Sequence, residues 1–422
     1  MLTLKNIREE PHRVCARLAV KNFDAHELLQ TIIALDDKRR ALQTATDAAL
    51  AKQNVAAKQI GMLMSQGKNE EAAQAKQSVM EEKEKIKTWE AELQTTTQQL
   101  HDATILLPNL PCELVPPGKG AEDNVLVQEG GMMPSLEQAL PHWEIAAKYG
   151  LIDFELGVKI TGAGFPVYKG KGARLQRALI SYFLDYNVSA GYLEVHPPLM
   201  VNETSGYGTG QLPDKEGQMY YVGLDHLYLI PTAEVPVTNM YRDMIMESEE
   251  LPVKLTAYTP CFRREAGSYG KEVRGLNRLH QFDKVEIVQL RKPEESYQAL
   301  DEMVAHVEKM VQSLELPYRI IRLCGGDMSF ASAMTYDFEV WSAAQERWLE
   351  VSSVTNFESF QANRLKLRFR DEKQKPQLLH TLNGSALALP RIVAALLENN
   401  QSPQGIVIPE ALRPYTGFAL ID

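Results

Sequence analysis

The chain has 422 residues, of which 44% are hydrophobic, so it can bury more than one core and we expect at least two domains. Its net charge of −10 and pI near 5.5 give no general attraction to nucleic acid, so any polyanion must meet locally concentrated positive charge. The N-terminus becomes charged within a few residues and no apolar run is long enough to cross a bilayer, which predicts a cytoplasmic protein without a signal peptide or membrane contact.

The first long elements are two helices with the apolar spacing of a coiled coil. Every seventh residue of the first is apolar, at Leu28, Leu35, Leu42, Ala49, Ala56 and Leu63. The second alternates steps of four and three, at Ala75, Val79, Glu82, Ile86, Trp89, Leu93, Thr96 and Leu100. The short turn at residues 65–69 favours antiparallel pairing within one chain, and a coiled coil between two chains is the alternative. Residues 1–102 are therefore predicted to form a helical arm.

Proline and glycine are dense in residues 103–134, which predicts an extended linker. Residues 135–422 then mix helix and strand patterns, and residues 173–190 are expected to be a helix. Strands are expected at residues 220–230, 255–263, 280–290, 318–323, 336–341 and 348–353. Tight hairpins outnumber strict βαβ units, so we predict an α+β domain with an antiparallel sheet. The chain contains no G-x-G-x-x-G or Walker A sequence and no C-x-x-C pair among its four cysteines.

The most informative segment is the hairpin pattern from Thr259 to Glu286, which encloses a basic, glycine-containing loop. Phe282, Lys284 and Glu286 alternate along the return strand, so they share one face. Two arginines begin the loop, and their planar donors suit phosphate and carboxylate groups. The pattern indicates a nucleotide site, and an ordinary amphipathic hairpin with a solvated charged loop is the alternative.

Three ordered segments carry a family resemblance. GYLEVHPP resembles motif 1 of the class II aminoacyl-tRNA synthetases, the FRRE hairpin resembles motif 2, and LNGSALALPRIVAALLENNQ resembles motif 3. With PTAEVP, HQFDKVE, YDFEVW and the two-helix arm, nearly the whole chain resembles the bacterial-type seryl-tRNA synthetases. The resemblance implies an antiparallel sheet flanked by helices, preceded by a long antiparallel coiled-coil arm. It divides the chain into a tRNA-binding arm (1–102), a linker (103–134) and a catalytic domain (135–422).

The resemblance also implies an activity and partners. The family activates L-serine with ATP to seryl-adenylate and transfers serine to the 3' end of tRNA(Ser), and tRNA(Sec) is an expected second acceptor. It further implies a homodimer, Mg²⁺, and contact between the arm and the long variable arm of the tRNA.

The implied site residues follow from the matched motifs. Arg263, Arg391 and Glu286 are the expected catalytic residues, with Arg263 bridging the serine carboxylate and the α-phosphate. Phe282 is expected to stack on adenine, and Glu350 and Ser353 are expected to hold Mg²⁺. The expected ATP-binding residues are Arg263, Arg264, Glu265, Phe282, Glu350, Val351, Ser352, Ser353 and Arg391. The expected serine-binding residues are Thr232, Ala233, Glu234, Arg263, Glu286, Asn383 and Ser385.

Structural roles are the alternative at several of these positions. Arg263 with Glu265 fits a structural ion pair, Phe282 fits core packing, and Thr232 and Ser385 fit helix caps or turns. The sequence also departs from the family pattern at Pro390, which precedes the motif 3 arginine, and at Gly164 and Asn363, where basic residues are common. Proline is sterically acceptable at a helix start.

Two other functions are compatible with parts of this pattern. One is a ligase that loads an amino acid onto a carrier protein, which the intact arm argues against. The other is a noncatalytic relative, which the joint presence of Arg263, Glu286, Glu350 and Arg391 argues against.

Overall fold

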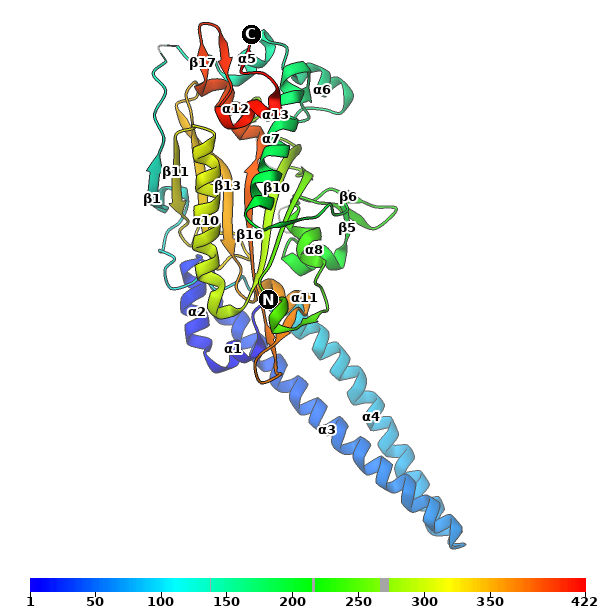
Figure 1. Ribbon diagram of the computed structural model, residues 1–422. Coiled ribbons are helices and arrows are strands. Elements are labelled where there is room, and N and C mark those ends of the chain that lie inside the picture. The colour runs from blue at the N-terminus through cyan, green and yellow to red at the C-terminus, as the bar shows by residue number, and fades with distance from the viewer. Residues whose placement is uncertain (137, 215–216, 266–272) are drawn as a thin grey trace. The chain divides into compact units, whose positions relative to one another are not determined.

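The computed structural model describes residues 1–136, 138–214, 217–265 and 273–422, which form two units (Figure 1). Unit 1 comprises residues 1–19 and 23–108, and unit 2 comprises residues 20–22 and 109–422. Residues 266–272, the tip of the basic loop in the 259–286 hairpin, lie outside the described residues. Among the helices described, none combines the length and the apolar character needed to span a membrane.

Unit 1 is helical. Two short helices, α1 (Leu4–Glu9) and α2 (Pro11–Val20), precede the long helices α3 (His26–Ser65) and α4 (Asn69–Thr104). α3 and α4 pack together as a hairpin joined by the short turn expected at residues 65–69. Every residue of the two predicted seams is buried or half-buried. The antiparallel coiled coil within one chain is therefore confirmed, whereas α1 and α2 are additions to the prediction.

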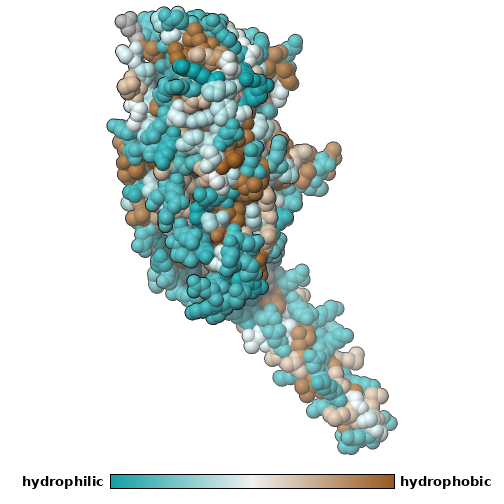
Figure 2. Space-filling view, viewed as in Figure 1, coloured by the Kyte–Doolittle hydropathy of each residue, from teal (hydrophilic) through white to brown (hydrophobic). Residues whose placement is uncertain are grey.

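The surface of the α3–α4 hairpin is mostly polar. Figure 2 shows hydrophilic side chains over much of it, with scattered hydrophobic ones, and the exposed apolar residues there include Val55, Met62, Met64 and Met80. The seam is narrow because small or polar residues occupy some of its positions, such as Ala49 and Thr96. The hairpin therefore presents most of its side chains to solvent.

A buried carboxylate near the start of α3 joins this helix to α1. Asp36 has no exposed surface, and it accepts charged hydrogen bonds from Arg8 at 3.0 Å and Arg39 at 2.8 Å, while Arg40 lies 2.9 Å away. Burial raises the pKa of Asp36, but the surrounding guanidinium groups outweigh it and hold that pKa below its usual range. Because the folded state keeps Asp36 ionised more strongly than the unfolded chain does, the pairing stabilises unit 1 near neutral pH.

Asp36→Asn should lower the free energy of unfolding by about 2 kcal/mol, since it leaves half-exposed arginines around a neutral group. The effect should be full above about pH 4 and should fade as acid titrates Asp36 in the wild type, because protonation removes the same charge. Urea unfolding followed by far-ultraviolet circular dichroism measures it. Asp37→Asn is the matched control, because Asp37 is 57% exposed and pairs with Arg8 only at the surface. Equal losses for the two variants would contradict the role given to Asp36.

Among the described residues, unit 2 is built on a sheet of eight strands with the order β1-β11-β12-β13-β16-β10-β9-β4. All neighbours are antiparallel except β4 and β9. The strands are β1 (Val125–Gly130), β11 (Tyr318–Arg322), β12 (Met334–Ser342), β13 (Arg347–Asn356), β16 (His380–Ala388), β10 (Gln281–Arg291), β9 (Val253–Phe262) and β4 (Leu193–Glu194). The fold class predicted from the sequence is confirmed.

Helices cover one face of this sheet and form the main core. The helices are α7 (Gly170–Ser189), α10 (Ser296–Ser313) and α12 (Leu389–Asn399), and Figure 1 shows α7 and α10 lying along the strands. Alternate strand residues such as Val285, Ile287 and Leu382 enter the core shared with these helices. The intervening residues point to the opposite face, so β10 directs Lys284 and Glu286 away from the core. That opposite face carries the pocket described below.

Smaller elements surround the sheet. The remaining helices are α5 (His142–Lys148), α6 (Phe154–Ile160), α8 (Glu203–Thr209), α9 (Glu234–Asn239), α11 (Phe360–Leu365) and α13 (Arg413–Thr416). The remaining strands are β2 (Ile152–Asp153), β3 (Val167–Tyr168), β5 (Met200–Asn202), β6 (Tyr221–Val222), β7 (Leu227–Leu229), β8 (Ile245–Met246), β14 (Arg368–Arg370), β15 (Pro376–Leu378), β17 (Gln401–Ser402), β18 (Gly405–Val407) and β19 (Leu420–Ile421).

Two segments differ from the sequence prediction. Residues 125–130, inside the expected linker, form β1 and pair with β11, because their main-chain groups complete the edge of the sheet. Residues 220–230 form two short strands, β6 and β7, because residues 223–226 turn between them. The predicted helix at 173–190 and the other predicted strands lie where expected to within a few residues.

Candidate active site

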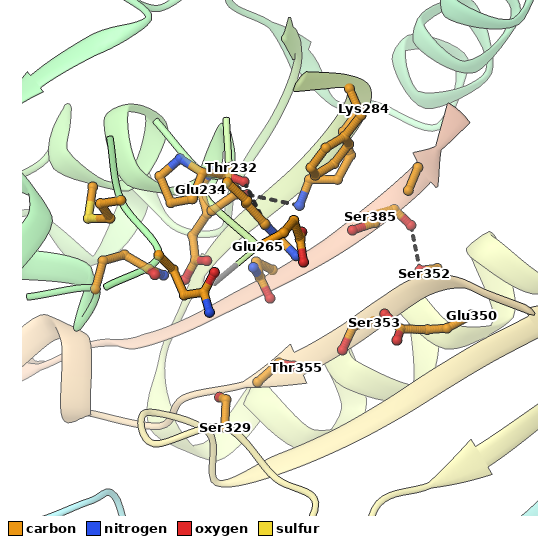
Figure 3. A pocket seen from close by; sticks show the side chains of 18 of the residues that line it. Thr232, Glu234, Glu265, Lys284, Ser329, Glu350, Ser352, Ser353, Thr355 and Ser385 are labelled. Atoms are coloured by element: carbon orange, nitrogen blue, oxygen red, sulfur yellow. Dashed lines mark hydrogen bonds between the residues drawn. The ribbon is translucent and has the colours of Figure 1, made fainter. Parts of the chain in front are cut away.

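A pocket of about 680 Å³ opens on the face of the sheet opposite the main core. Its floor comes from β10, β13 and β16, and the first turn of α12 closes one end. The loop at 329–331 supplies a further wall, as do Thr209, Gly210, Gln211, Pro213, Asp214, Gln218 and Met219. Figure 3 shows acidic, hydroxyl and basic side chains converging on this space. Such a mixture in one cavity suits a polar, charged ligand.

Most of the site residues expected from the sequence meet in this pocket. They are Thr232, Glu234, Arg263, Glu265, Phe282, Glu350, Val351, Ser352, Ser353, Asn383, Ser385 and Arg391. They come from the start of α9, the residues after β9, and from β10, β13, β16 and α12, and the antiparallel pairing of β10 with β9 and β16 and of β13 with β16 places them together. The expectation that Phe282, Lys284 and Glu286 share the site face of β10 agrees with this geometry.

Three of the expected residues lie elsewhere. Ala233 is fully buried in an apolar cluster with Val237 and Ala257, so it shapes the site from behind. Arg264 is exposed, and its backbone N–H donates to the Gln218 carbonyl at 2.8 Å. Glu286 is 1% exposed and lies beneath Lys284 and Thr232.

A compact network surrounds the Glu286 carboxylate. Its Oε2 accepts hydrogen bonds from the Lys284 ammonium at 2.5 Å and the Thr232 hydroxyl at 3.1 Å, and Lys284 also donates to Thr232 at 2.9 Å. The other oxygen of Glu286, Oε1, is buried and has no hydrogen-bond partner among the described residues. A buried carboxylate oxygen without a donor is costly in the free protein, so it is an available acceptor for a bound ligand.

Glu234 is a second buried carboxylate beside the first. Gln361 donates to its Oε1 at 2.5 Å, and the Gln361 carbonyl oxygen accepts from the Thr381 hydroxyl at 2.6 Å. Burial, together with the nearby charge of Glu286, raises the pKa of Glu234 to about 7. Two neighbouring buried acidic groups with Lys284 between Glu286 and Thr232 still leave carboxylate oxygens available to a positively charged ligand.

Arg263 lies at the end of β9 with its guanidinium 5.2 Å from the centre of the Phe282 ring. Its Nε donates to the Pro231 carbonyl at 3.3 Å. Glu265 forms an ion pair with Arg278 at 2.8 Å. The structure therefore pairs Glu265 with Arg278, and not with Arg263 as the structural alternative assumed. The guanidinium group of Arg263 therefore lines the pocket with donors that its Pro231 contact does not use.

Oxygen-bearing side chains gather at the end of the pocket near α12. Glu350 and Ser353 lie side by side on β13 in Figure 3, and Arg391 donates to the Glu350 carbonyl at 2.8 Å and lies 3.7 Å from its carboxylate. Pro390 is in the first turn of α12, so proline at this helix start is accommodated as expected. These groups offer two oxygen ligands and one cation to a phosphate-bearing ligand.

The residues behind Ser353 fit a divalent cation. Ser353 pairs with Asp337 across β12 and β13 and hydrogen-bonds its carboxylate. Burial and the charge of Glu350 raise the pKa of Asp337 well above its usual range, and its Oδ1 is buried without a partner among the described residues. Within the described ranges no three His, Cys, Asp or Glu side chains could hold a metal by themselves. Hard oxygen donors with room for ligand phosphate suit Mg²⁺.

Gly164, one of the departures from the family pattern, has a local explanation. Its φ is +81°, and a Cβ placed there would lie 2.4 Å from the ring of His280. The Gly164 carbonyl accepts from the His280 backbone N–H at 2.9 Å, directly before the return strand β10 of the 259–286 hairpin. Glycine is therefore required by both the backbone conformation and the close approach.

Sequence reasoning missed several residues of the site. Lys284 contacts the Glu286 carboxylate, and Gln361 contacts the Glu234 carboxylate. The Asn277 carbonyl accepts a hydrogen bond from Arg391 Nε. The alternation of β10 placed Lys284 on the right face, so this signal was present. Gln361 gave no signal, because its contact with Glu234 spans 127 residues.

Comparisons with known proteins define the class and then the family. The chain matches two family models, the tRNA synthetase class II core domain (G, H, P, S and T) over residues 222–400 and the seryl-tRNA synthetase N-terminal domain over residues 1–111. Unit 2 is thus built around a class II aminoacyl-tRNA synthetase core. A serine-tRNA ligase of Salinibacter ruber is 51% identical, covering 100% of this chain and 99% of its own length. The chain belongs to the seryl-tRNA synthetase family, which confirms the resemblance found in the motifs.

Solved structures agree with this assignment. The structure of a seryl-tRNA synthetase from Pyrococcus horikoshii complexed with ATP matches with a TM-score of 0.93 and 32% identity, covering 100% of this chain and 99% of that chain. A cytoplasmic serine-tRNA ligase from Naegleria fowleri in complex with AMP matches with a TM-score of 0.88 and 25% identity, over the same shares of the two chains. The similarity extends over both units.

Proposed function

We propose that this chain is a serine-tRNA ligase that activates L-serine with ATP and transfers it to the 3' end of tRNA(Ser). The observation that carries this proposal is the pocket that Glu234 and Arg263 line, with buried Glu286 behind Lys284 and Thr232, while Glu350, Ser353 and Arg391 occupy the end near α12. Serine brings an ammonium group and a carboxylate, and ATP brings phosphates. The charges in the pocket complement all three kinds of group.

In the first step a serine carboxylate oxygen forms a bond to the α-phosphorus of ATP, and the bond to the bridging oxygen of the β-phosphate breaks to release pyrophosphate. Arg263 would bridge the serine carboxylate and the α-phosphate, and Arg391 would contact the γ-phosphate. Fixed cations favour this step because they meet the charge that develops at phosphorus and hold two anions in line. In the second step a ribose hydroxyl of the tRNA attacks the serine carbonyl and releases AMP.

Adenine would stack on Phe282, whose ring lines the pocket. The Arg263 guanidinium lies over this ring, so adenine would take the other ring face or the guanidinium would shift toward the phosphates. Glu265 would read the adenine edge or orient the loop, and Arg264, Val351 and Ser352 would complete the ATP site. Glu350 and Ser353 would hold Mg²⁺, which neutralises phosphate charge when bound, and Asp337 would orient Ser353.

Serine would occupy the region of Thr232, Glu234, Glu286, Asn383 and Ser385. The free Oε1 of Glu286 and the carboxylate of Glu234 are suitable acceptors for its ammonium and hydroxyl groups. Lys284 fixes Glu286 in place through their 2.5 Å contact. Alanine would leave these buried polar groups unpaired, which is the basis expected for its rejection.

Serine affinity should depend on the protonation of Glu234. Because burial raises the pKa of Glu234 to about 7, a large share of this carboxyl is neutral at pH 6 and ionised at pH 8. An ionised carboxylate binds an ammonium better, so kcat/KM for serine should rise by roughly 5- to 10-fold between these pH values. Serine-dependent exchange of pyrophosphate into ATP measures it, and Glu234→Gln should flatten the profile. An unchanged rise in that variant would assign the titration to another group.

The arm of residues 1–102 would bind the tRNA, with residues 103–134 as the connection and residues 135–422 as the catalytic domain. RNA helices are recognised through shape and backbone, so a slender hairpin of mostly polar surface is suitable, and its affinity should weaken with salt. tRNA(Sec) would be a second acceptor. The proposal includes a cytoplasmic location and a homodimer, and exposed apolar residues on and after the edge strand β1, including Leu126, Val127 and Met132, support the dimer.

Charging of tRNA with radiolabelled serine tests the proposed function. Purified protein, ATP, Mg²⁺ and bacterial tRNA(Ser) should yield acid-precipitable serine, and omission of ATP should abolish it. The same assay with tRNA(Sec) tests the second acceptor. Transfer of serine to a carrier protein in place of tRNA would favour the carrier-protein ligase, and a folded protein that neither activates nor transfers serine would favour the noncatalytic relative.

A further inference from the structure

The loop of residues 324–333 forms one wall of the pocket and is held from its other side. Ser329, Phe330 and Ala331 line the pocket, on the side of Thr355 and Phe357. Figure 3 shows Ser329 below Thr355, across the pocket from Thr232 and Glu234. The residues that hold this loop come from two short segments of unit 2, at residues 20–22 and at residue 109.

The Lys21 side chain holds the loop by hydrogen bonds to the carbonyl groups of the loop. Its ammonium donates to the carbonyls of Ser329 at 2.9 Å, Ser332 at 2.7 Å and Phe330 at 3.4 Å. Burial lowers the pKa of Lys21 to about 7, while the three carbonyls favour the ammonium, because only that form has three N–H donors. One side chain thus fixes three consecutive or near-consecutive peptide groups.

Asn109 holds the same loop at a neighbouring point. Its backbone N–H donates to the Phe330 carbonyl at 2.9 Å, and its amide Nδ2 donates to the Ala331 carbonyl at 2.9 Å and the Phe357 carbonyl at 2.8 Å. Asn109 is 3% exposed, so its donors replace water for the three carbonyls that they contact.

Close backbone packing supports the same attachment. A Cβ on Gly325 would lie 1.9 Å from the Val20 carbonyl oxygen, and one on Gly326 would lie 2.5 Å from the Lys119 carbonyl oxygen. The Asn22 amide donates to the Gly118 carbonyl at 2.9 Å. The segment around Lys21 therefore packs directly on the loop, and it also contacts the neighbouring segment at residues 118–119.

The two holding residues occupy special places in the chain. Residues 20–22 lie between two stretches of unit 1, residues 1–19 and 23–108, and Asn109 directly follows the last residue of unit 1. The chain passes between unit 2 and the long α3–α4 hairpin through residues 20–22 on one side and Asn109 on the other. Both of these segments hydrogen-bond to the same loop of the pocket.

We propose that Lys21 and Asn109 are positioning residues that fix the 329–332 loop as the wall of the serine region. This inference rests on the proposed function, because it takes serine as the ligand beside Thr355 and Asn383. A loop released from these donors samples more conformations, and ordering it again opposes serine binding. The groups proposed for ATP lie on the sheet and α12, so ATP binding is expected to change little.

Lys21→Met and Asn109→Ala in the full-length protein test this proposal, with Lys119→Met as the matched control. Lys119 is exposed and also belongs to unit 2, and the change removes the same charge. In serine-dependent pyrophosphate exchange, Lys21→Met should raise KM for serine on the order of 10-fold, with kcat and KM for ATP altered less than about two-fold. Asn109→Ala should act in the same direction. Peptide-level hydrogen exchange should show faster exchange at residues 324–333 in both variants.

The outcomes separate this inference from the proposed function. Failure of the wild type to exchange with serine would overturn the proposed function. Wild-type exchange with unchanged KM for serine in both variants, or equal losses in Lys119→Met, would overturn the positioning role alone. A uniform fall in kcat together with a lower melting temperature would also overturn it, because that result indicates general destabilisation. If Lys21→Met does not fold, Asn109→Ala alone decides by the same KM criterion.

Discussion

Replacing Arg263 with alanine should lower the rate of serine-dependent pyrophosphate exchange by about 1,000-fold or more, because the variant loses the cation proposed to join the two reacting anions. The side chain is well placed for this role: it lines the pocket, lies beside Phe282, and donates from Nε to the Pro231 carbonyl. Removal of that contact should disturb the fold little. The loss should appear mainly in kcat, because the interaction strengthens as charge develops at phosphorus.

Two further variants make the Arg263 result specific. Arg263→Lys keeps the positive charge but loses the planar pair of donors, so it should recover only part of the rate. Arg368→Ala on the exposed side of β14 is the control for loss of an arginine, and it should exchange like the wild type. Near-normal exchange by Arg263→Ala would reject the catalytic assignment.

Deleting residues 27–101 should separate the two halves of the reaction. The deletion removes nearly all of α3 and α4 but keeps unit 2, including Lys21 and Asn109, so serine activation should change less than about three-fold. Charging of tRNA(Ser) should fall by about 100-fold or more, because the variant lacks the surface proposed to contact the tRNA.

The deletion variant needs measurements on both reactions with one preparation. Pyrophosphate exchange confirms that the active site is intact, and serine charging over a range of tRNA concentrations reports the loss of tRNA binding. The wild type should also lose charging efficiency as salt rises, whereas exchange should change little. Unchanged charging by the shortened protein would reject the role proposed for the arm.

The sequence predicted those elements whose signals are long and local. α3 and α4 carry their seams over many turns, so every predicted seam position is buried or half-buried in the structure. The β9–β10 hairpin was also predicted, because ten or eleven residues of strand pattern flank a glycine-containing loop. A hydrophobic period that repeats over a long segment predicts a helix even where individual seam positions are polar, such as Glu82 and Thr96.

Short elements and edge elements were missed for physical reasons. β1 has six residues, all but one exposed, and lies in a segment rich in proline and glycine, so it lacks the alternation of a half-buried strand. Its pairing with β11 depends on main-chain groups, which sequence pattern does not reveal. α1 has six residues, and it is held by the contact of Arg8 with Asp36 on α3, which is 28 residues away.

The site was predicted mainly through its family motifs, which marked the residues that line the pocket. The groups that support those residues were not predicted, because their contacts are made across the fold. Gln361 reaches Glu234, and Lys21 reaches the loop at 329–332, through pairings that span more than a hundred residues. Neither residue type is unusual in its local sequence, so only the folded structure reveals these contacts.

Exchange of pyrophosphate into ATP, measured with each standard amino acid in parallel, tests the central claim most directly. The wild-type protein with ATP and Mg²⁺ should exchange rapidly with serine, and alanine and threonine should be weaker by several orders of magnitude. That result would establish the substrate and the adenylate chemistry together. A folded protein that is silent with every amino acid, or that prefers an amino acid other than serine, would contradict the proposed function.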